Sequence, residues 1–344
     1  MPNPETSADS PNLDILRCVA VLCVFVFHLA RLLGVDHLTR PPIYSLGHWG
    51  VLMFFVHTSL VLMRSLARSE ATPGIHRLYL NFMVRRVFRL FPLCWTMVLV
   101  IFFLRLPVGH MDRGGHFHAV SMSFSGALAN LFLVQNLAHV ESFEAPLWSL
   151  PFEMQMYLVL PLVYLLTRWR ANLTVIVAAW MLWCALVWTW PASSAYDMRN
   201  FVPCFMAGVI SFKMPGLRRR LPSALWLPMI LITTLVYLSR PTTSVGWVCC
   251  LLLAGSIPQF EQVRHGLTKR AALLIARYSY GIYLVHFVVL WFIFDRLGMT
   301  GVSGIVLYSA LTAAIAALLY HSIEAPGIGA GRLLVGWYGR WTLG

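Results

Sequence analysis

The sequence has few charged residues, and very few of them are acidic. Only 11% of its 344 residues are charged, and 13 Asp and Glu stand against 26 Lys and Arg. A soluble globular domain usually carries about 25% charged residues. Because 59% of the chain is also hydrophobic, we predict an all-α polytopic membrane protein and exclude a soluble globular domain.

Cysteine motifs and long polar segments are lacking as well. The seven cysteines form no CxxC pair and lie mostly in apolar stretches, which indicates neither a disulfide framework nor a zinc site; we expect no metal. No loop is long enough for a second soluble domain, so residues 1–344 are predicted to form a single transmembrane domain. Residues 1–12 are expected to be a flexible N-terminal segment and residues 325–344 a cytoplasmic tail.

The long apolar stretches that are present predict the membrane spans. A span needs about 20 mainly apolar residues. The first stretch lacks an A-x-A cleavage site after it and is predicted to be a retained span. The segment 118–137 is only moderately apolar, and either a span or a re-entrant segment fits it. The ten predicted transmembrane helices are residues 13–33, 47–67, 90–104, 147–166, 172–190, 198–213, 222–239, 244–260, 278–294 and 302–320.

The basic residues orient these spans. If the N-terminus is cytoplasmic and 118–137 does not cross, 19 of the 26 basic residues fall on the cytoplasmic side and seven fall outside. That asymmetry follows the positive-inside rule. We therefore predict ten helices around a central polar cavity with both termini cytoplasmic. The positive net charge is explained by these loops, and no nucleic-acid partner is expected.

The first span carries two ionisable residues, Arg17 and His28, within "LDILRCVAVLCVFVFHLARLL". Eleven residues are almost three helical turns, so both side chains point the same way, about 16 Å apart along the axis. A charge inside a membrane helix is costly and is usually functional. The two residues therefore indicate a polar stripe along a cavity, although an interfacial arginine and a packed histidine fit the pattern equally well.

Two further polar groups recur near predicted spans. Arg85, Arg86 and Arg89 lie in "NFMVRRVFRLFPLCW" at a predicted cytoplasmic helix start, with Pro92 expected to break the helix shortly after. They are either positive-inside anchors or fork-shaped donors for a phosphorylated ligand. Glu153 lies at the outer start of a span and is expected either to partner His28 or to interact with the helix dipole.

In these segments the chain resembles the acyltransferase-3 family of integral membrane acyltransferases. The family's opening "LDGLR…H" is matched by "LDILRCVAVLCVFVFH", and its "RRxxRIxPxYW" by "RRVFRLFPLCW". Its "LWSLSVEEQFYLxxP" appears as "LWSLPFEMQMYLVLP", its "SYxIYLxH" as "SYGIYLVH", and its "xxEKP" as "IEAP". The motifs occur in the family's order over nearly the whole chain.

The resemblance implies a transferase that uses acyl-CoA, with acetyl-CoA expected, as its cytoplasmic donor substrate. It also implies O-acetylation of a carbohydrate hydroxyl on the outer side, a polysaccharide modification at the bacterial inner membrane. Arg17, Arg85, Arg86 and Arg89 would then bind the phosphates of coenzyme A. His28 is expected to act as general base, or less readily as acyl acceptor, with Glu153 orienting it. Tyr283 and His286 are expected to line the acceptor vestibule, although His286 also fits a packed histidine.

Several residues depart from the family's pattern. Its "FFVLSGFLI" reads "FFVHTSLVL" here, which introduces His57, its "EEQ" reads "EMQ", and Cys18 stands where a glycine is usual. No extracellular esterase-like domain is expected. These differences leave the reaction class unchanged and leave the acceptor open.

Two alternatives accompany this prediction. A polytopic transporter of a small or lipid-linked substrate also uses intramembrane Arg, His and Glu, but internal repeats and glycine-broken helix pairs are not evident. The loop histidines His110, His116 and His118 suggest a metal site only weakly, because we find no matching carboxylate or cysteine spacing. We expect a mobile outer loop there.

Overall fold

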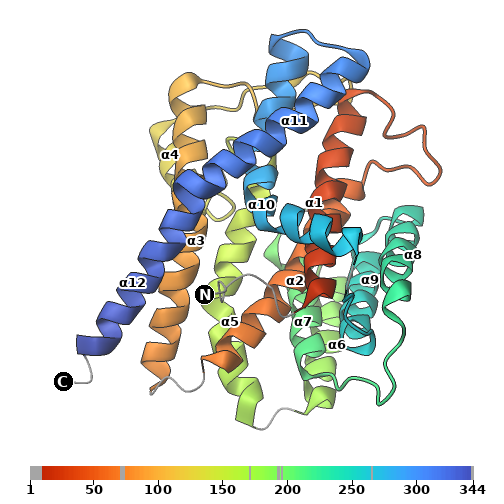
Figure 1. Ribbon diagram of the computed structural model, residues 1–344, viewed down its shortest axis with the longest axis vertical. Coiled ribbons are helices and arrows are strands. Elements are labelled where there is room, and N and C mark those ends of the chain that lie inside the picture. The colour runs from red at the N-terminus through yellow and green to blue at the C-terminus, as the bar shows by residue number, and fades with distance from the viewer. Residues whose placement is uncertain are drawn as a thin grey trace. The chain divides into compact units, whose positions relative to one another are not determined.

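The structure is a computed structural model that describes residues 10–69, 74–169, 172–191, 194, 197–264 and 266–341. It is built almost entirely from helices, as predicted (Figure 1). Its described strands are the two-residue β1 (His110–Met111) and β2 (Phe117–His118), which pair antiparallel. Residues 1–9 of the predicted flexible segment 1–12 lie outside the described residues, and so do residues 342–344 of the predicted tail.

The helices group into two compact units, each assembled from two separate stretches of chain. The first unit comprises Met1–Ala67 and Leu162–Ser279. It contains the C-terminal part of α5 (Leu150–Trp169) and the first part of α10 (Leu267–Leu290). Its other elements are α1 (Pro11–Leu32), α2 (Leu46–Arg68), α6 (Leu173–Thr189), α7 (Met198–Lys213), η2 (Ser223–Leu225), α8 (Trp226–Ser239), α9 (Thr243–Ser256) and η3 (Ile257–Gln259).

Small residues allow the helices of the first unit to approach closely. A β-carbon added to Gly50 of α2 would lie 2.6 Å from the carbonyl oxygen of Ala20 on α1, and one on Gly208 of α7 would lie 2.6 Å from that of Val56 on α2. Such contacts are typical of membrane bundles, where packing and hydrogen bonds replace the hydrophobic drive between helices. Trp49 of α2, fully buried, adds a 2.9 Å hydrogen bond to Thr234 of α8.

The N-terminus of α1 is anchored by Asn12, which is fully buried. Its side chain donates to the carbonyl of Glu261 at 3.0 Å and accepts from the amide of Val263 at 3.1 Å. Its own carbonyl accepts a 3.0 Å hydrogen bond from the indole of Trp226. Because α1 already begins at Pro11, the last residues of the segment predicted to be flexible are ordered parts of this helix.

The second unit comprises Arg68–Pro161 and Tyr280–Gly344. It contains the strands, the N-terminal part of α5 and the second part of α10. Its other elements are α3 (Ile75–Leu104), α4 (Phe124–Leu131), the 3₁₀ helix η1 (Ala145–Ser149), the π-helices η4 (Trp291–Arg296) and η5 (Tyr320–Glu324), α11 (Gly301–Leu319) and α12 (Ala325–Trp341).

Helix α3 continues through Pro92, so the predicted break is wrong. The helix runs for 30 residues and ends at Leu104. Pro92 cannot donate to the carbonyl of Phe88, four residues earlier. That carbonyl lies against α12, where a β-carbon on Gly327 would be only 2.9 Å from it. Close packing of α12 along α3 (Figure 1) therefore covers the freed carbonyl, and neighbouring helices commonly make proline tolerable in membrane helices.

The segment 118–137 forms no continuous span. Its regular structure is β2 and the eight-residue α4, which at about 1.5 Å per residue covers only about 12 Å. The side chain of Asn130, fully buried, bonds the backbone of Glu141 and Phe143. Gln135 donates to the carbonyl of Leu147 at 3.2 Å. Asn130 and Gln135 thus form hydrogen bonds with backbone groups of the irregular segment that follows.

Most predicted spans overlap the observed helices, but α3 begins at Ile75 instead of residue 90 and α10 begins at Leu267 instead of residue 278. By length and apolar composition, six described segments are long enough to cross a membrane, while the helices in 173–189, 223–239 and 243–259 are shorter. The ten-span count and the location of the termini therefore stay predictions. The tail residues 325–341 form α12 and pack on α3. The six long segments are Pro11–Leu32, Leu46–Arg68, Ile75–Leu104, Ala145–Arg168, Leu267–Arg296 and Gly301–Trp337.

Candidate active site

His28 lies on α1 in the first unit and is half-buried. Its Nδ1 is 3.0 Å from the carbonyl oxygen of Val24, one turn earlier. A carbonyl oxygen only accepts, so the neutral ring holds its proton on Nδ1 and its lone pair on Nε2. The ring also meets Phe27 edge-on, with centroids 4.8 Å apart. The imidazole can therefore take up a proton or an acyl group at Nε2.

Arg17 lies on the same helix, which is unbroken from Pro11 to Leu32. The unbroken helix confirms that three turns separate Arg17 from His28, as their spacing predicted. Asp14, which is 2% exposed, lies close enough for its charge and that of Arg17 to interact, and Lys269 of α10 lies near the same carboxylate. Asp14 therefore offsets part of the positive charge at this end of α1. Asp14 stands in the quoted "LDILR" stretch but was not among the predicted site residues.

Arg85, Arg86 and Arg89 lie on α3 in the second unit and are half-buried. Since α3 begins at Ile75, Arg86 is eleven residues into the helix, about 16 Å from its start. These arginines therefore sit well inside α3, not at its first turn. The guanidinium of Arg86 lies over the ring of Phe82, with its carbon 5.7 Å from the centroid.

Glu153 lies in the first turn of α5 and accepts a hydrogen bond from the hydroxyl of Tyr157, one turn later on the same helix. The charges of Glu153, Arg86 and Arg89 all act on the Tyr157 hydroxyl. The ring of Tyr157 also meets Phe82 of α3 edge-on, with centroids 6.4 Å apart. The structure thus gathers two of the predicted donor-binding arginines and the predicted catalytic acid around Tyr157.

Tyr283 and His286 lie on α10 and are 6% and 1% exposed. The Tyr283 hydroxyl donates to the carbonyl of Pro146 at 2.9 Å and is 2.7 Å from the hydroxyl of Ser149, so it holds η1 against α10. The Nδ1 of His286 lies 3.0 Å from the carbonyl of Ile282. Both side chains are thus packed into the second unit. Their vestibule role stays a prediction.

Other members of this cluster were not selected from the sequence. Tyr280 of α10 donates to the carbonyl of Leu90 at 2.6 Å and lies within reach of the charges of Glu153 and Glu324. Glu324 is 1% exposed and ends the π-helix η5, and π-helical turns occur frequently at functional sites. Tyr280 belongs to the quoted motif "SYGIYLVH" and Glu324 to "IEAP", so these motifs could have identified both residues as site candidates.

The proposed pairing of His28 with Glu153 joins residues of different units. It stays a prediction, and so does the joint binding of one donor by Arg17 and the α3 arginines. Within the second unit, Glu144 is fully buried directly before η1 and lies near Tyr283. It is a second buried acid that the sequence analysis left aside.

Asp112 is a carboxylate that contacts two of the loop histidines, His116 and His118, although their spacing did not predict it. Asp112 lies 3.1 Å from Nε2 of His118 and accepts from the amides of His116 and Gly114 at 3.0 and 2.8 Å. The hydrogen bond to His118 and then the backbone bonds hold the pKa of Asp112 well below its usual range. Within the described ranges, no group of three or more His, Cys, Asp or Glu is arranged to hold a metal ion.

Half-buried arginines and a carboxylate lie together on the apolar helices α3 and α5 of the second unit, and a base-competent histidine lies on α1 of the first unit. Comparison with known proteins identifies the class of this protein. The model of the acyltransferase-3 family, described as an acyltransferase domain, matches residues 10–321. The chain therefore belongs to the acyltransferase-3 family and is an acyltransferase.

Two curated relatives align along most of the chain. It is 28% identical to the putative peptidoglycan O-acetyltransferase YrhL of Bacillus subtilis and 26% identical to the peptidoglycan O-acetyltransferase OatA of Listeria monocytogenes. Each alignment covers 92% of this chain but only 54% and 55% of the relative. The chain thus spans about half the length of these relatives. No solved structure matches the chain.

Proposed function

We propose that this protein transfers an acetyl group from acetyl-CoA in the cytoplasm to a hydroxyl of a peptidoglycan-like carbohydrate on the outer side of the bacterial inner membrane. The observation that carries the proposal is the geometry of His28, whose hydrogen bond to Val24 places the lone pair on Nε2. Membership of the acyltransferase-3 family suggests that this base serves an acyl transfer. The names of the two relatives suggest the acetyl group and the acceptor.

The donor would be held by its phosphates. Coenzyme A carries a pyrophosphate and a 3′-phosphate, and arginine engages such groups through paired hydrogen bonds. Arg86 and Arg89 both lie close enough to Tyr157 for their charges to reach its hydroxyl, and Arg85 lies beside Arg86 on the same helix; the part of Arg17 in donor binding stays a prediction. The pantetheine arm would then lead the thioester towards His28.

The chemical step needs one base and no redox partner. Nε2 of His28 removes the proton of the acceptor hydroxyl as its oxygen attacks the thioester carbonyl carbon. The tetrahedral intermediate collapses, the C–S bond breaks, and the sulfur of coenzyme A takes the proton back from the imidazolium. The product is an acetyl ester and free coenzyme A. If His28 instead accepted the acetyl group first, the same atoms would balance over two steps.

Glu153 would serve this step by fixing positive charge near the thioester. It is held by Tyr157 and lies in the same cluster as Arg86 and Arg89. A carboxylate fixed in a low-dielectric site orients cations and an imidazole more strongly than one in water. Glu153 would therefore orient the arginines that bind the donor, and its action on His28 stays a prediction.

The test is an acetyl-transfer assay with the full chain in proteoliposomes. Radiolabelled acetyl-CoA is supplied on one side and soluble peptidoglycan fragments on the other, and label in the glycan is counted. His28→Ala is expected to reduce transfer at least about 100-fold, the usual contribution of a general base. His37→Ala is the matched control, because His37 lies in the exposed loop after α1, and it should keep full activity.

Transfer that persists in His28→Ala would contradict the proposed base. Label that stays with the protein when the acceptor is omitted would instead support the acyl-histidine route. Movement of a substrate across the membrane without acetylation would overturn the proposed reaction.

A further inference from the structure

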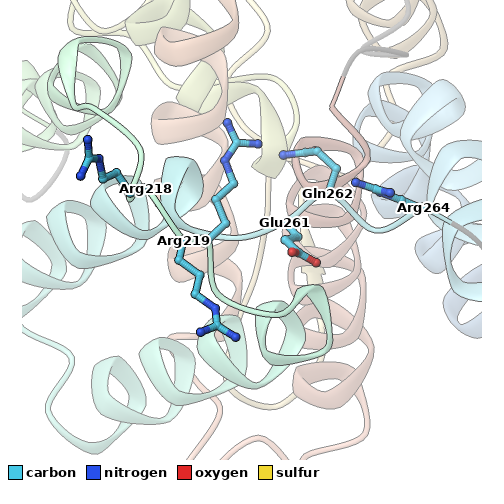
Figure 2. A pocket seen from close by; sticks show the side chains of 6 residues that line it. Arg218, Arg219, Glu261, Gln262 and Arg264 are labelled. Atoms are coloured by element: carbon cyan, nitrogen blue, oxygen red, sulfur yellow. The ribbon is translucent and has the colours of Figure 1, made fainter.

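A basic pocket lies in the first unit and is not part of the cluster around Tyr157. Its volume is about 390 Å³, and at about 30 Å³ per water molecule it has room for a phosphate group and its neighbours. Its walls come from the segment between α7 and α8 and the segment between η3 and α10 (Figure 2). The lining residues are Arg218, Arg219, Arg220, Glu261, Gln262 and Arg264.

The two walls of this basic pocket are joined by backbone hydrogen bonds. Leu221 and Phe260 form a parallel bridge, in which the amide of Leu221 donates to Gln259 at 2.8 Å and the amide of Glu261 donates to Leu221 at 2.9 Å. The side chain of Gln259 adds a 2.8 Å bond from the amide of Leu217. The arginines between these residues are therefore carried by a braced segment and not by a free loop.

Gln262 is oriented by the start of α1. Its amide oxygen accepts from the hydroxyl of Ser10 at 3.1 Å and from the backbone amide of Asn12 at 3.3 Å. Because both donors use the oxygen, the amide nitrogen is the group that Gln262 presents to the pocket, and Figure 2 shows this residue between Arg219 and Arg264. The pocket thus offers a neutral donor beside its cations.

The charges of the pocket are unbalanced. Four arginines and a single carboxylate, that of Glu261, line the pocket, and the described part of the chain provides no ion pair to any of the four arginines. Arginines that serve only as positive-inside anchors need no common cavity and no oriented amide. Guanidinium groups that share a pocket with an amide donor match the several oxygens of a phosphate group.

We propose that this basic pocket binds a phosphate-bearing anion. If the predicted orientation holds, the pocket faces the cytoplasm, where two sources supply that chemistry. One is a soluble nucleotide such as the adenosine phosphate end of coenzyme A, and the other is an anionic lipid headgroup, which basic pockets at the cytoplasmic membrane surface bind. The proposal concerns binding alone and does not depend on acetyl transfer.

The experiment measures binding to the full chain in two arms. In the first, adenosine 3′,5′-bisphosphate is titrated into protein in a neutral detergent and followed calorimetrically. In the second, bound phosphatidylglycerol is counted by native mass spectrometry after reconstitution in phosphatidylcholine nanodiscs with added phosphatidylglycerol. A nucleotide source gives binding in the first arm, and a lipid source gives binding in the second.

Variants connect the binding to the pocket. The double variant Arg218→Gln, Arg264→Gln should lower the affinity about fivefold in whichever arm shows binding, since exposed charge contacts are individually modest. Glu261→Gln should raise that affinity. Arg240→Gln is the matched control, because Arg240 is exposed at the opposite end of α8, and it should leave binding unchanged.

The proposal is overturned if neither arm shows binding, or if the double variant binds as well as the parent chain. All titrations are repeated with His28→Ala. Because that variant lacks the proposed base, its unchanged binding would show that the pocket functions even if the proposed reaction is wrong.

Discussion

At the scale of single residues, one contact decides what a histidine on a membrane helix can do. His28 and His286 both direct Nδ1 to a carbonyl oxygen one turn earlier on their own helix, at 3.0 Å in each case. Both rings therefore carry the lone pair on Nε2. They differ in access, since His286 is 1% exposed whereas His28 is half-buried. Proton transfer needs a reactant within hydrogen-bond reach, and of the two rings that of His28 is the more accessible.

Tyr157 gives a residue-scale prediction about Glu153. Tyr157→Phe removes the hydroxyl that donates to Glu153 and keeps the ring that meets Phe82. A hydrogen bond to a charged group is worth about 1.5–3 kcal/mol. We expect kcat for acetyl transfer to fall about tenfold while the KM for acetyl-CoA and the melting temperature change little.

The matched control for Tyr157 is Tyr79→Phe. Tyr79 lies on α3, and its hydroxyl donates a hydrogen bond to the carbonyl of Leu158 on α5 at 3.2 Å. Its loss should leave kcat unchanged. Equal effects in both variants, or a fall in stability that accounts for the lost rate, would show that Tyr157 has a packing role only.

At the scale of elements, the loop between α3 and α4 is organised by one carboxylate. β1 and β2 are only two residues long, and so short a hairpin is marginal by itself. Asp112 supplies the missing order by bonding two amides of the turn and the ring of His118. The rings of His110 and His118 also stack with centroids 4.9 Å apart. A short hairpin braced by Asp112 thus forms in this loop, and the mobility expected from the sequence stays a prediction.

The lowered pKa of Asp112 predicts how this hairpin responds to pH. An acid with a lowered pKa in the folded state contributes its full stabilisation above its unfolded pKa of about 3.9. That contribution is lost as the pH falls towards the folded value. We expect hydrogen-exchange protection of the amides of Gly114 and His116 to be constant from about pH 7 to pH 5 and to decline below about pH 4.

Asp112→Asn should lower that protection at neutral pH, because a neutral amide attracts His118 less. Asp36→Asn is the control, since Asp36 meets His37 in another loop at 3.3 Å. Protection that is the same in Asp112→Asn and the parent chain would refute the assigned role.

At the scale of the whole molecule, the number of crossings depends on the shorter helices. Six segments are long enough to cross, whereas those in 173–189, 223–239 and 243–259 have 17 residues each. Seventeen residues rise about 25 Å, slightly less than the roughly 30 Å hydrocarbon core. Ten crossings therefore require these three helices and the 16-residue α7 (Met198–Lys213) to span by local thinning of the bilayer or by anchoring at their ends.

Reporter fusions test this arrangement. A reporter inserted at Gly115 of the hairpin should read as external, and one inserted at Gly216, between α7 and α8, should read as cytoplasmic. The reason is that the basic residues favour a cytoplasmic side for the second loop. Readings on the same side for both insertions would reject the ten-span arrangement with cytoplasmic termini.

The sequence by itself determined the helices and most of the candidate residues. Runs of apolar side chains must satisfy their own backbone groups in lipid, so their positions in the sequence predict where helices lie. The spacing of Arg17 and His28 likewise predicts their common face, because an unbroken helix has a fixed rotation per residue. The positions of Glu153 and the arginines of α3 near apolar stretches singled them out, and the family motifs then suggested their roles.

Only the tertiary structure decided how those residues are used. Whether Pro92 ends α3 depends on the close approach of Gly327, and whether Tyr157 meets Phe82 of α3 depends on how α5 packs. Gln262 presents its nitrogen to the basic pocket because Ser10 bonds its oxygen from about 250 residues away. Such contacts join segments that are distant in sequence. A local pattern cannot specify them, because they arise only when the helices pack.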